Sequence, residues 1–293
     1  MRNMKRVIYS IYVDVPAKEH FGESKCKYDT LDKASITTNA FKKHYERLII
    51  SKHQYAKAIG VPFIMYEYDN RYQTFEKNLL KDFPELTGYE IVNFYKIHLL
   101  YELAKKYDEI LYLDFDAIPV TKDSFFDVWD LQNHIAVYNN NTNINKYTAL
   151  DEIINGIRSP TAKYYNTQAM LIDKGLDPNN DVINTGIIGA SKEQILKLDF
   201  FGDFKDTIDL MTKLRKKGLD NLYPQNIIDM FRYDNETIFS YKVRMNSVNV
   251  QWLDKRWHYF FDKQFYVPKE TKIVHTVNKD FDTVWRYDEK YNL

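Results

Sequence analysis

Two aspartates separated by one residue end an apolar run in the middle of the chain. Asp114 and Asp116 follow Ile110–Leu113, and Pro119 comes shortly after them. A run of this kind, bounded by a turn signal, is typical of a buried strand. Residues i and i+2 of an extended chain point to the same side, so the two carboxylates can converge on one point. Because they repel each other, the pattern indicates a divalent cation with oxygen ligands; the alternative is a turn in which one aspartate caps the next segment.

The elements around this strand alternate in type. From the hydrophobic spacing we predict, in chain order, a strand at 7–13, a helix at 39–59, a strand at 62–66, a helix at 93–106 and a strand at 110–113. This β-α-β-α-β order predicts an α/β fold with a doubly wound, mostly parallel sheet. Ligands bind outside the carboxyl ends of the strands in such sheets, and Asp14 and Asp116 both fall at such ends.

The C-terminal half is less regular and embellishes this sheet. We predict strands at 135–137, at 182–190 with an interruption at Gly186, in part of 241–250 and at 272–275, and helices at 146–157, 160–174, 191–198, 203–217 and 221–232. The polar, Asn-rich insert 139–180 lies beside the expected cleft, where such inserts serve as lids or substrate loops. The chain has no repeat and no linker, so we expect one domain over residues 1–293.

Composition excludes several classes of function. Lys+Arg and Asp+Glu both number 41, so the formal net charge is zero and the basic surplus of a nucleic-acid-binding protein is missing. The single cysteine, Cys26, excludes an internal disulfide and a multi-cysteine zinc site. No apolar stretch approaches the length of a membrane span, and Met1–Arg6 has no signal-peptide pattern, so we expect a cytoplasmic protein.

Common nucleotide and hydrolase motifs are also missing. Gly186 and Gly189 stand without the third glycine of a dinucleotide-binding loop or the lysine of a P-loop, and no Gly-x-Ser-x-Gly occurs. A second acidic pair, Glu67 and Asp69, follows the predicted strand at 62–66. The neighbouring Asn, Arg and Tyr residues favour a solvated turn there.

Several segments, taken in order, carry a resemblance to a known family. They are Lys96, YDEILYLDFDAIPV (107–120), Asn184-Thr185-Gly186, Asp234-Asn235-Glu236, LDKRWH (253–258) and IVH (273–275). In this order they resemble the nucleotide-sugar-dependent glycosyltransferases of the type A, Rossmann-like fold, and within them the retaining group that includes glycogenin and the lipopolysaccharide galactosyltransferases. The likeness spans roughly residues 6–280. Asp254 and His258 replace the family's usual Pro and Asn, and the Gly-x-x-Lys-Pro-Trp that follows the family's histidine is missing after His275.

The resemblance implies roles for individual residues. It implies a metal site of Asp114, Asp116 and His275, donor or phosphate contacts from Tyr12, Val13, Lys96, Gly186 and Lys279, and catalytic positions at Asn184, Asp234 and Glu236. Manganese tolerates mixed carboxylate and imidazole ligands, so it is favoured over magnesium. Residues 1–120 would then form the nucleotide-binding half and residues 121–293 the half that closes the metal and acceptor site.

Each of these residues also has a purely structural interpretation. His275, Tyr12 and Trp257 could belong to the core, and Lys96 could be an exposed helix lysine. Asn184 could be a turn residue, while Asp234 and Glu236 could be a helix N-cap and its first turn. Trp257 and His258 could instead form part of an acceptor wall.

The resemblance implies metal-dependent transfer of a sugar from a nucleoside diphosphate sugar, with uridine diphosphate the commonest nucleotide, to a glycan, protein or lipid-linked acceptor. One alternative is a nucleotidyltransferase that makes nucleotide sugars. Such an enzyme needs a glycine-rich basic loop after the first strand, where this chain has Asp14-Val15-Pro16-Ala17-Lys18. Another alternative is a non-catalytic nucleotide- or carbohydrate-binding protein on the same scaffold.

Overall fold

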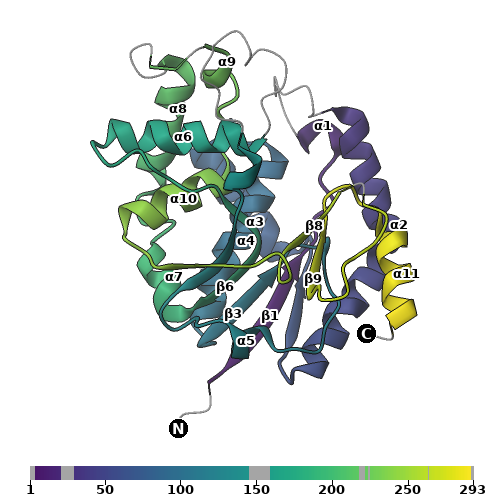
Figure 1. The fold of residues 1–293 in the computed structure, drawn as a ribbon. Helices are drawn as coiled ribbons and strands as arrows, with labels where there is room; N and C mark the ends of the chain where they lie inside the picture. The colour runs from purple at the N-terminus through teal and green to yellow at the C-terminus, as the bar shows by residue number, and fades with distance from the viewer. Residues whose placement is uncertain are drawn as a thin grey trace.

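The computed structural model describes residues 4–20, 30–144, 159–217, 222–223, 225–262 and 264–291. Figure 1 shows a central sheet that carries helices on both faces. The strands are β1 (Arg6–Ile11), β2 (Phe63–Tyr66), β3 (Glu109–Leu113), β4 (Ala117–Pro119), β5 (Ile135–Asn139), β6 (Ile183–Ser191), β7 (Val250–Trp252), β8 (Tyr259–Phe261) and β9 (Ile273–Thr276).

The helices lie mainly between these strands in the chain. They are α1 (Ala17–His20), α2 (Leu31–Ala58), α3 (Asn70–Asp82), α4 (Gly88–Ala104), α5 (Phe125–Val128), the 3-10 helix η1 (Asn141–Asn143), α6 (Ser159–Asp173), α7 (Lys192–Leu198), α8 (Phe204–Lys217), α9 (Gln225–Ile228), α10 (Asn235–Met245) and α11 (Phe281–Tyr291). No helix in the described part of the chain combines the length and apolar character that a membrane span requires.

The large sheet has the strand order β2-β1-β3-β6-β5-β7. Its β2-β1, β1-β3 and β5-β7 pairs are parallel, while β6 is antiparallel to both of its neighbours. Every strand of this sheet except β6 therefore runs in one direction, which confirms the predicted α/β fold with a mostly parallel sheet. A second sheet, of order β4-β9-β8, was not predicted as a unit.

Alternating side chains explain why both faces of the large sheet are covered. Val7 and Tyr9 of β1 pack with the cluster under α4, α8 and α10, whereas Ile8 packs on the opposite side with Tyr55 of α2. Successive side chains of a strand point to opposite faces, and here both sets are apolar. The sheet must therefore be buried on both sides, as a doubly wound fold requires.

Local capping sets where the helices around the site begin. Thr87 accepts from the Glu90 amide and the Glu90 carboxylate accepts from the Thr87 amide, so α4 begins at Gly88, earlier than the predicted 93. Asp234 caps α10 by accepting from the amides of Glu236 and Thr237. Gly60, with a φ of +70°, ends the predicted helix at 39–59 as expected, although that helix begins at Leu31.

Five sequence predictions of local structure need correction or fall outside the described residues. One is the helix at 221–232, of which only α9, Gln225–Ile228, is helical among the described residues. β6 continues through Gly186 as one strand, and the interruption predicted there corresponds to a shift in its pairing with β5, which moves from Ala136 opposite Gly189 to Tyr138 opposite Asn184. Asp69 caps α3 where a solvated turn was predicted. Most of 241–250 is the end of α10, with a strand only from Val250. The predicted helix at 146–157 lies outside the described residues.

The small sheet brings the C-terminal part of the chain against the end of β3. β4 follows Asp116 directly and pairs antiparallel with β9, so that Ala117 lies opposite His275. The Thr276 amide also donates to the Asp116 carbonyl. This ladder ties β9 to the turn after β3, although the two segments are far apart in the sequence.

Candidate active site

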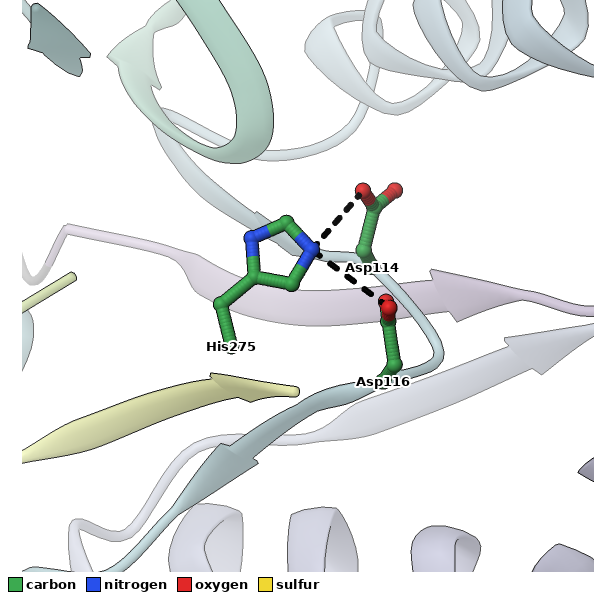
Figure 2. A group of neighbouring side chains, drawn as sticks. All are labelled: Asp114, Asp116 and His275. Atoms are coloured by element: carbon green, nitrogen blue, oxygen red, sulfur yellow. Dashed lines mark ion pairs between the residues drawn. The ribbon is translucent and has the colours of Figure 1, made fainter. Parts of the chain in front are cut away.

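The predicted metal ligands come together at the carboxyl end of β3. His275 Nε2 lies 3.5 Å from Asp116 Oδ2 and 3.9 Å from Asp114 Oδ2, and one ligand atom from each of the three residues lies within 4.8 Å of the others. Figure 2 shows the imidazole of His275 facing both carboxylates across a small gap. The Asp-x-Asp motif and the distant histidine therefore form one cluster.

Asp114 is held from the side away from His275. Its Oδ1 accepts from the Tyr112 hydroxyl at 2.5 Å and forms an ion pair with Lys96 Nζ at 3.3 Å. Burial and the charge of Asp114 raise the pKa of Tyr112 well above its ordinary value, so Tyr112 stays a proton donor. Lys96 is itself only 4% exposed. It is thus a buried site lysine, rather than the exposed helix lysine of the structural interpretation.

Asp116 lies deeper and has two basic side chains beside it, those of Lys279 and His275. Its Oδ2 forms ion pairs with Lys279 Nζ and with His275. Burial would raise the pKa of Asp116, but the charges of Lys279 and His275 outweigh it and hold that pKa well below its usual range. Lys279 sits at a φ of +62°, which is unfavourable for a residue with a Cβ. The protein thus tolerates local backbone strain with this ammonium group beside Asp116.

The missing side chain of Gly186 leaves room for the imidazole of His275. A Cβ at this position would lie 2.4 Å from His275 Cε1 and 2.8 Å from its Nδ1. Only glycine therefore lets β6 pass this close to the imidazole. The structure thus places Gly186, which was predicted to contact the donor, against His275.

A second histidine lies directly behind His275. His258 is fully buried, and its Nε2 lies 2.8 Å from His275 Nδ1. Burial, together with the neighbouring His275, lowers the pKa of His258 well below its ordinary value. A fully buried His258 does not form part of an acceptor wall. Trp257 is buried as well, against Phe125 and Trp129, which confirms its core interpretation.

A buried lysine lies beneath the Asp-Phe-Asp turn. Lys52 of α2 is fully buried and donates from Nζ to the carbonyl of Phe115 at 2.8 Å and to that of Leu48 at 3.3 Å. Burial lowers the pKa of Lys52 to about 7, although Asp116 and Asp114 counteract this effect. Lys52 is not among the site residues predicted from the sequence. Its spacing from Leu48, Tyr55 and Ala56 places it on the buried face of the helix, and a lysine on such a face is a usable signal.

The predicted catalytic residues form a second acidic cluster next to the first. Glu236 Oε1 accepts from Asn184 Nδ2 at 3.0 Å and from the Thr185 amide at 2.8 Å, while its Oε2 pairs with Lys163. Burial would raise the pKa of Glu236, but Lys163 and Lys96 outweigh it and lower that pKa. Asn184 is also fully engaged, since its Oδ1 accepts from the Gly186 amide at 3.0 Å.

Lys163 of α6 joins the two acids of this cluster. Its Nζ lies 3.4 Å from Asp234 Oδ2 and also pairs with Glu236. Burial would lower the pKa of Lys163, but the two carboxylates outweigh it and raise that pKa. No sequence signal singled out Lys163, because it lies within the Asn-rich insert 139–180 and is brought to the site only by the packing of α6.

Tyr12 and Val13 lie just beyond the end of β1, at the same edge of the sheet. The Tyr12 ring stacks on Phe115 at 4.7 Å between centroids and also packs on Phe41 and Tyr45. Val13 is partly buried against the core that contains α4. Tyr12 is thus a half-buried aromatic that also packs on Phe115, between Asp114 and Asp116.

The three ligands fit a divalent cation. A cation in octahedral coordination at about 2.0–2.1 Å holds adjacent ligand atoms about 3 Å apart. The observed separations of 3.5 and 3.9 Å from His275 Nε2 need to shorten by less than 1 Å. Two carboxylate oxygens and one imidazole nitrogen suit manganese and similar ions. Asp114 is partly exposed, so the site is open to solvent on that side.

Comparison with solved structures finds matches to sugar-transferring enzymes. No family model and no curated protein matches the sequence. Among solved structures, a glycosyltransferase involved in glycosylation of the major capsid of PBCV-1 is 14% identical, with 99% of this chain and 100% of that chain covered and a TM-score of 0.41. The galactosyltransferase LgtC in complex with donor and acceptor sugar analogues is 11% identical, with 92% and 87% covered and a TM-score of 0.39.

Mouse xyloside xylosyltransferase 1 is 10% identical, with 94% of this chain and 98% of that chain covered and a TM-score of 0.43. All three TM-scores lie below 0.5.

Proposed function

We propose that this protein is a metal-dependent glycosyltransferase that uses a nucleoside diphosphate sugar as donor. The observation that carries the proposal is the meeting of Asp114, Asp116 and His275 at the carboxyl end of β3, with Lys96 and Lys279 beside them. This is the edge of the sheet where ligands of doubly wound folds bind. A divalent cation held there would supply a Lewis acid for the diphosphate leaving group.

Charge balance at the cluster favours a diphosphate. Asp114 and Asp116 are matched by Lys96 and Lys279, so the side chains alone are formally neutral. A divalent cation would leave the cluster with about two positive charges, which complements the two negative charges of a nucleoside diphosphate sugar. We propose manganese as the cation and a uridine diphosphate sugar as the donor, the latter from the sequence resemblance.

The residues then divide into groups by task. Asp114, Asp116 and His275 hold the cation, while Lys96 and Lys279 are poised to donate to phosphate oxygens. Tyr12 and Val13 lie where a base would leave the cluster along β1. In this proposal residues 1–120 bind the nucleotide, and residues 121–293 close the metal site and receive the glycan, protein or lipid-linked acceptor.

Glu236 and Asn184 hold neighbouring groups in position and do not attack the donor. Both oxygens of Glu236 and both polar atoms of Asn184 are engaged by other protein groups. A nucleophilic carboxylate needs an oxygen free to attack, so we propose that Glu236 positions Lys163 and the start of β6. Asp234 uses its Oδ1 to cap α10, and its Oδ2 lies 3.4 Å from Lys163 Nζ, so it is the better placed carboxylate to contact the donor sugar.

The nucleotidyltransferase alternative is disfavoured by the segment after β1. Residues 12–20 contain no glycine and include Pro16, so their backbone lacks the close-approach positions that a triphosphate loop needs. We propose sugar transfer with retained configuration, as the sequence resemblance implies. The anomeric configuration of the product, read by NMR, tests that part separately.

The first experiment is thermal unfolding with a panel of nucleoside diphosphates and nucleotide sugars, each with and without Mn²⁺. A ligand at 100 times its dissociation constant adds about 2.7 kcal/mol, which moves the midpoint by several degrees. We expect one nucleotide to raise the midpoint only with Mn²⁺, and Asp116→Asn to abolish the rise. Asp209→Asn, which alters an exposed ion pair on α8, is the matched control and is expected to keep it.

Release of the nucleotide from the sugar donor, measured with the same proteins, then tests catalysis. The proposal is contradicted if no diphosphate raises the midpoint, or if the rise is indifferent to both Mn²⁺ and Asp116. Mn²⁺-dependent binding without release, over a broad panel of acceptors, would favour the non-catalytic binding protein.

A further inference from the structure

His258 makes a single side-chain hydrogen bond among the described residues, and that bond is to the metal-site histidine. Its Nε2 lies 2.8 Å from His275 Nδ1. Its Nδ1 is buried and has no hydrogen-bond partner. The ring is otherwise enclosed by aromatic side chains, with centroids 5.0 Å from Tyr138 and 4.6 Å from Phe260. Among the described residues, the polar atoms of this fully buried side chain therefore contact only His275.

The positions of the protons follow from this geometry. Two ring nitrogens 2.8 Å apart must share one proton, which belongs either to His275 Nδ1 or to His258 Nε2. A metal ligand needs an unprotonated nitrogen, so His275 can bind through Nε2 as a neutral ring only if its proton sits on Nδ1. His258 must then accept at Nε2 and carry its own proton on the orphaned Nδ1.

We propose that His258 is a positioning residue for His275: it accepts the Nδ1 proton of His275 and so keeps Nε2 free and aimed at the cation. This inference rests on the proposed function, whose metal site it deepens. A hydrogen bond from the second ring nitrogen orients a ligating histidine and raises its basicity.

The other neighbours of His275 in the described part of the chain do not accept a hydrogen bond from its Nδ1. Phe260 stacks on the His275 ring at 5.3 Å between centroids, and Gly186 confines the ring from the other strand. These contacts limit where the ring can lie, but neither offers a hydrogen-bond acceptor to Nδ1. Steric confinement and the hydrogen bond thus act on different properties: the first restricts ring position, and the second selects the tautomer.

Two substitutions of similar size separate these effects. His258→Leu removes the acceptor, whereas His258→Gln places an amide oxygen near the position of Nε2. We expect His258→Leu to weaken Mn²⁺ binding by about 10–100-fold, the usual effect of losing such an outer hydrogen bond, and His258→Gln to restore most of it. Isothermal titration with Mn²⁺, with and without uridine diphosphate, measures both. Thermal unfolding without metal reports whether each variant is folded.

A spectroscopic measurement reads the tautomers directly and does not depend on a variant folding. In wild-type protein with ¹⁵N-labelled histidine, titrated with Zn²⁺ as a diamagnetic probe, we expect His275 to be protonated at Nδ1 and metal-bound at Nε2. We expect His258 to be protonated at Nδ1 both before and after the titration. A His258 that is protonated at Nε2 in the metal-bound protein overturns the proposal.

The outcomes also separate this inference from the proposed function. If wild-type protein binds Mn²⁺ and nucleotide but a folded His258→Leu variant binds them equally well, the positioning role is wrong and the proposed function stands. If the wild type binds neither Mn²⁺ nor Zn²⁺ at Asp116 and His275, both are wrong. Loss of binding in Leu and Gln variants alike, with unchanged unfolding, shows that the ring shape matters rather than its acceptor, and this also overturns the proposal.

Discussion

Two acidic clusters lie side by side at one edge of the sheet, and they differ in what satisfies their carboxylates. In the cluster of Asp234 and Glu236, backbone amides, Asn184 and Lys163 occupy the oxygens of Glu236. In the cluster of Asp114 and Asp116, one oxygen of each carboxylate faces the imidazole of His275 across 3.5–3.9 Å. A buried carboxylate whose hydrogen bonds are complete supports shape, whereas one that faces other ligand atoms can receive a cation.

The contrast shows that residue type alone does not assign a role. Both clusters pair acids with lysines, and both lie beside β6. Asn184 and Gly186 are only two residues apart, yet Asn184 completes the hydrogen bonds of Glu236 while Gly186 makes room for His275. Substitutions of Asp116 and of Glu236 should therefore affect different measurements: ligand binding for Asp116 and stability for Glu236.

The largest effect on activity is expected in the cluster of Asp114 and Asp116. Asp116→Asn removes one charge from the cation site and leaves Lys279 without its carboxylate partner. We expect nucleotide-sugar turnover to fall by about 10²–10³-fold, typical of losing one electrostatic group from a catalytic site. Mn²⁺-dependent nucleotide binding should be lost in parallel. Unimpaired turnover in this variant, at saturating donor and Mn²⁺, would show that the cluster does not serve catalysis.

Substitution of Glu236, in the second cluster, should instead change the stability of the folded protein. Glu236→Ala leaves Lys163 and the Thr185 amide without their main partner in a mostly buried setting. We expect a loss of about 3 kcal/mol in the free energy of unfolding, measured with denaturant, because breaking a buried ion pair strands the remaining charge. Glu236→Gln, which keeps an acceptor oxygen, should lose less. A near-neutral Glu236→Ala would mean that its contacts do not hold the fold together.

Two glycines of β6 give a matched pair. A Cβ at Gly186 would meet His275, while a Cβ at Gly189 would meet Phe125, each at 2.4 Å. We expect Gly186→Ala to displace the imidazole and weaken Mn²⁺ binding by about 10-fold. Gly189→Ala should leave Mn²⁺ binding intact but lower the unfolding midpoint, because it overpacks an apolar core. Equal effects of both variants on Mn²⁺ binding would remove the proposed distinction.

The smallest effect concerns pH. Burial lowers the pKa of Lys52 to about 7, so above that pH the folded protein releases a proton that the unfolded chain keeps up to its ordinary pKa of 10.5. Stability linked to Lys52 therefore rises with pH between these values, by about 1 kcal/mol from pH 7 to 8. Lys52→Met should abolish this rise, measured by denaturant unfolding at several pH values. An unchanged pH slope in the variant would assign the rise to other groups.

The amino-acid sequence by itself determined the first three strands of the large sheet and the position of the two aspartates after β3. Apolar runs define β1, β2 and β3, and the spacing of Asp114 and Asp116 after β3 places both carboxylates at a strand end. These are local properties, because the period of an extended chain decides which side chains share a face. The order of later motifs also pointed to His275, although only by resemblance to a family.

Only the tertiary structure decided which partners the site residues find. The β4-β9 ladder brings His275 to Asp116, helix packing brings Lys163 to Glu236, and burial under the turn brings Lys52 to Phe115. The hydrogen bond between His258 and His275 depends on parallel pairing of β8 with β9. None of these contacts has a local signature, because each joins segments whose proximity follows from burying apolar faces over the whole chain.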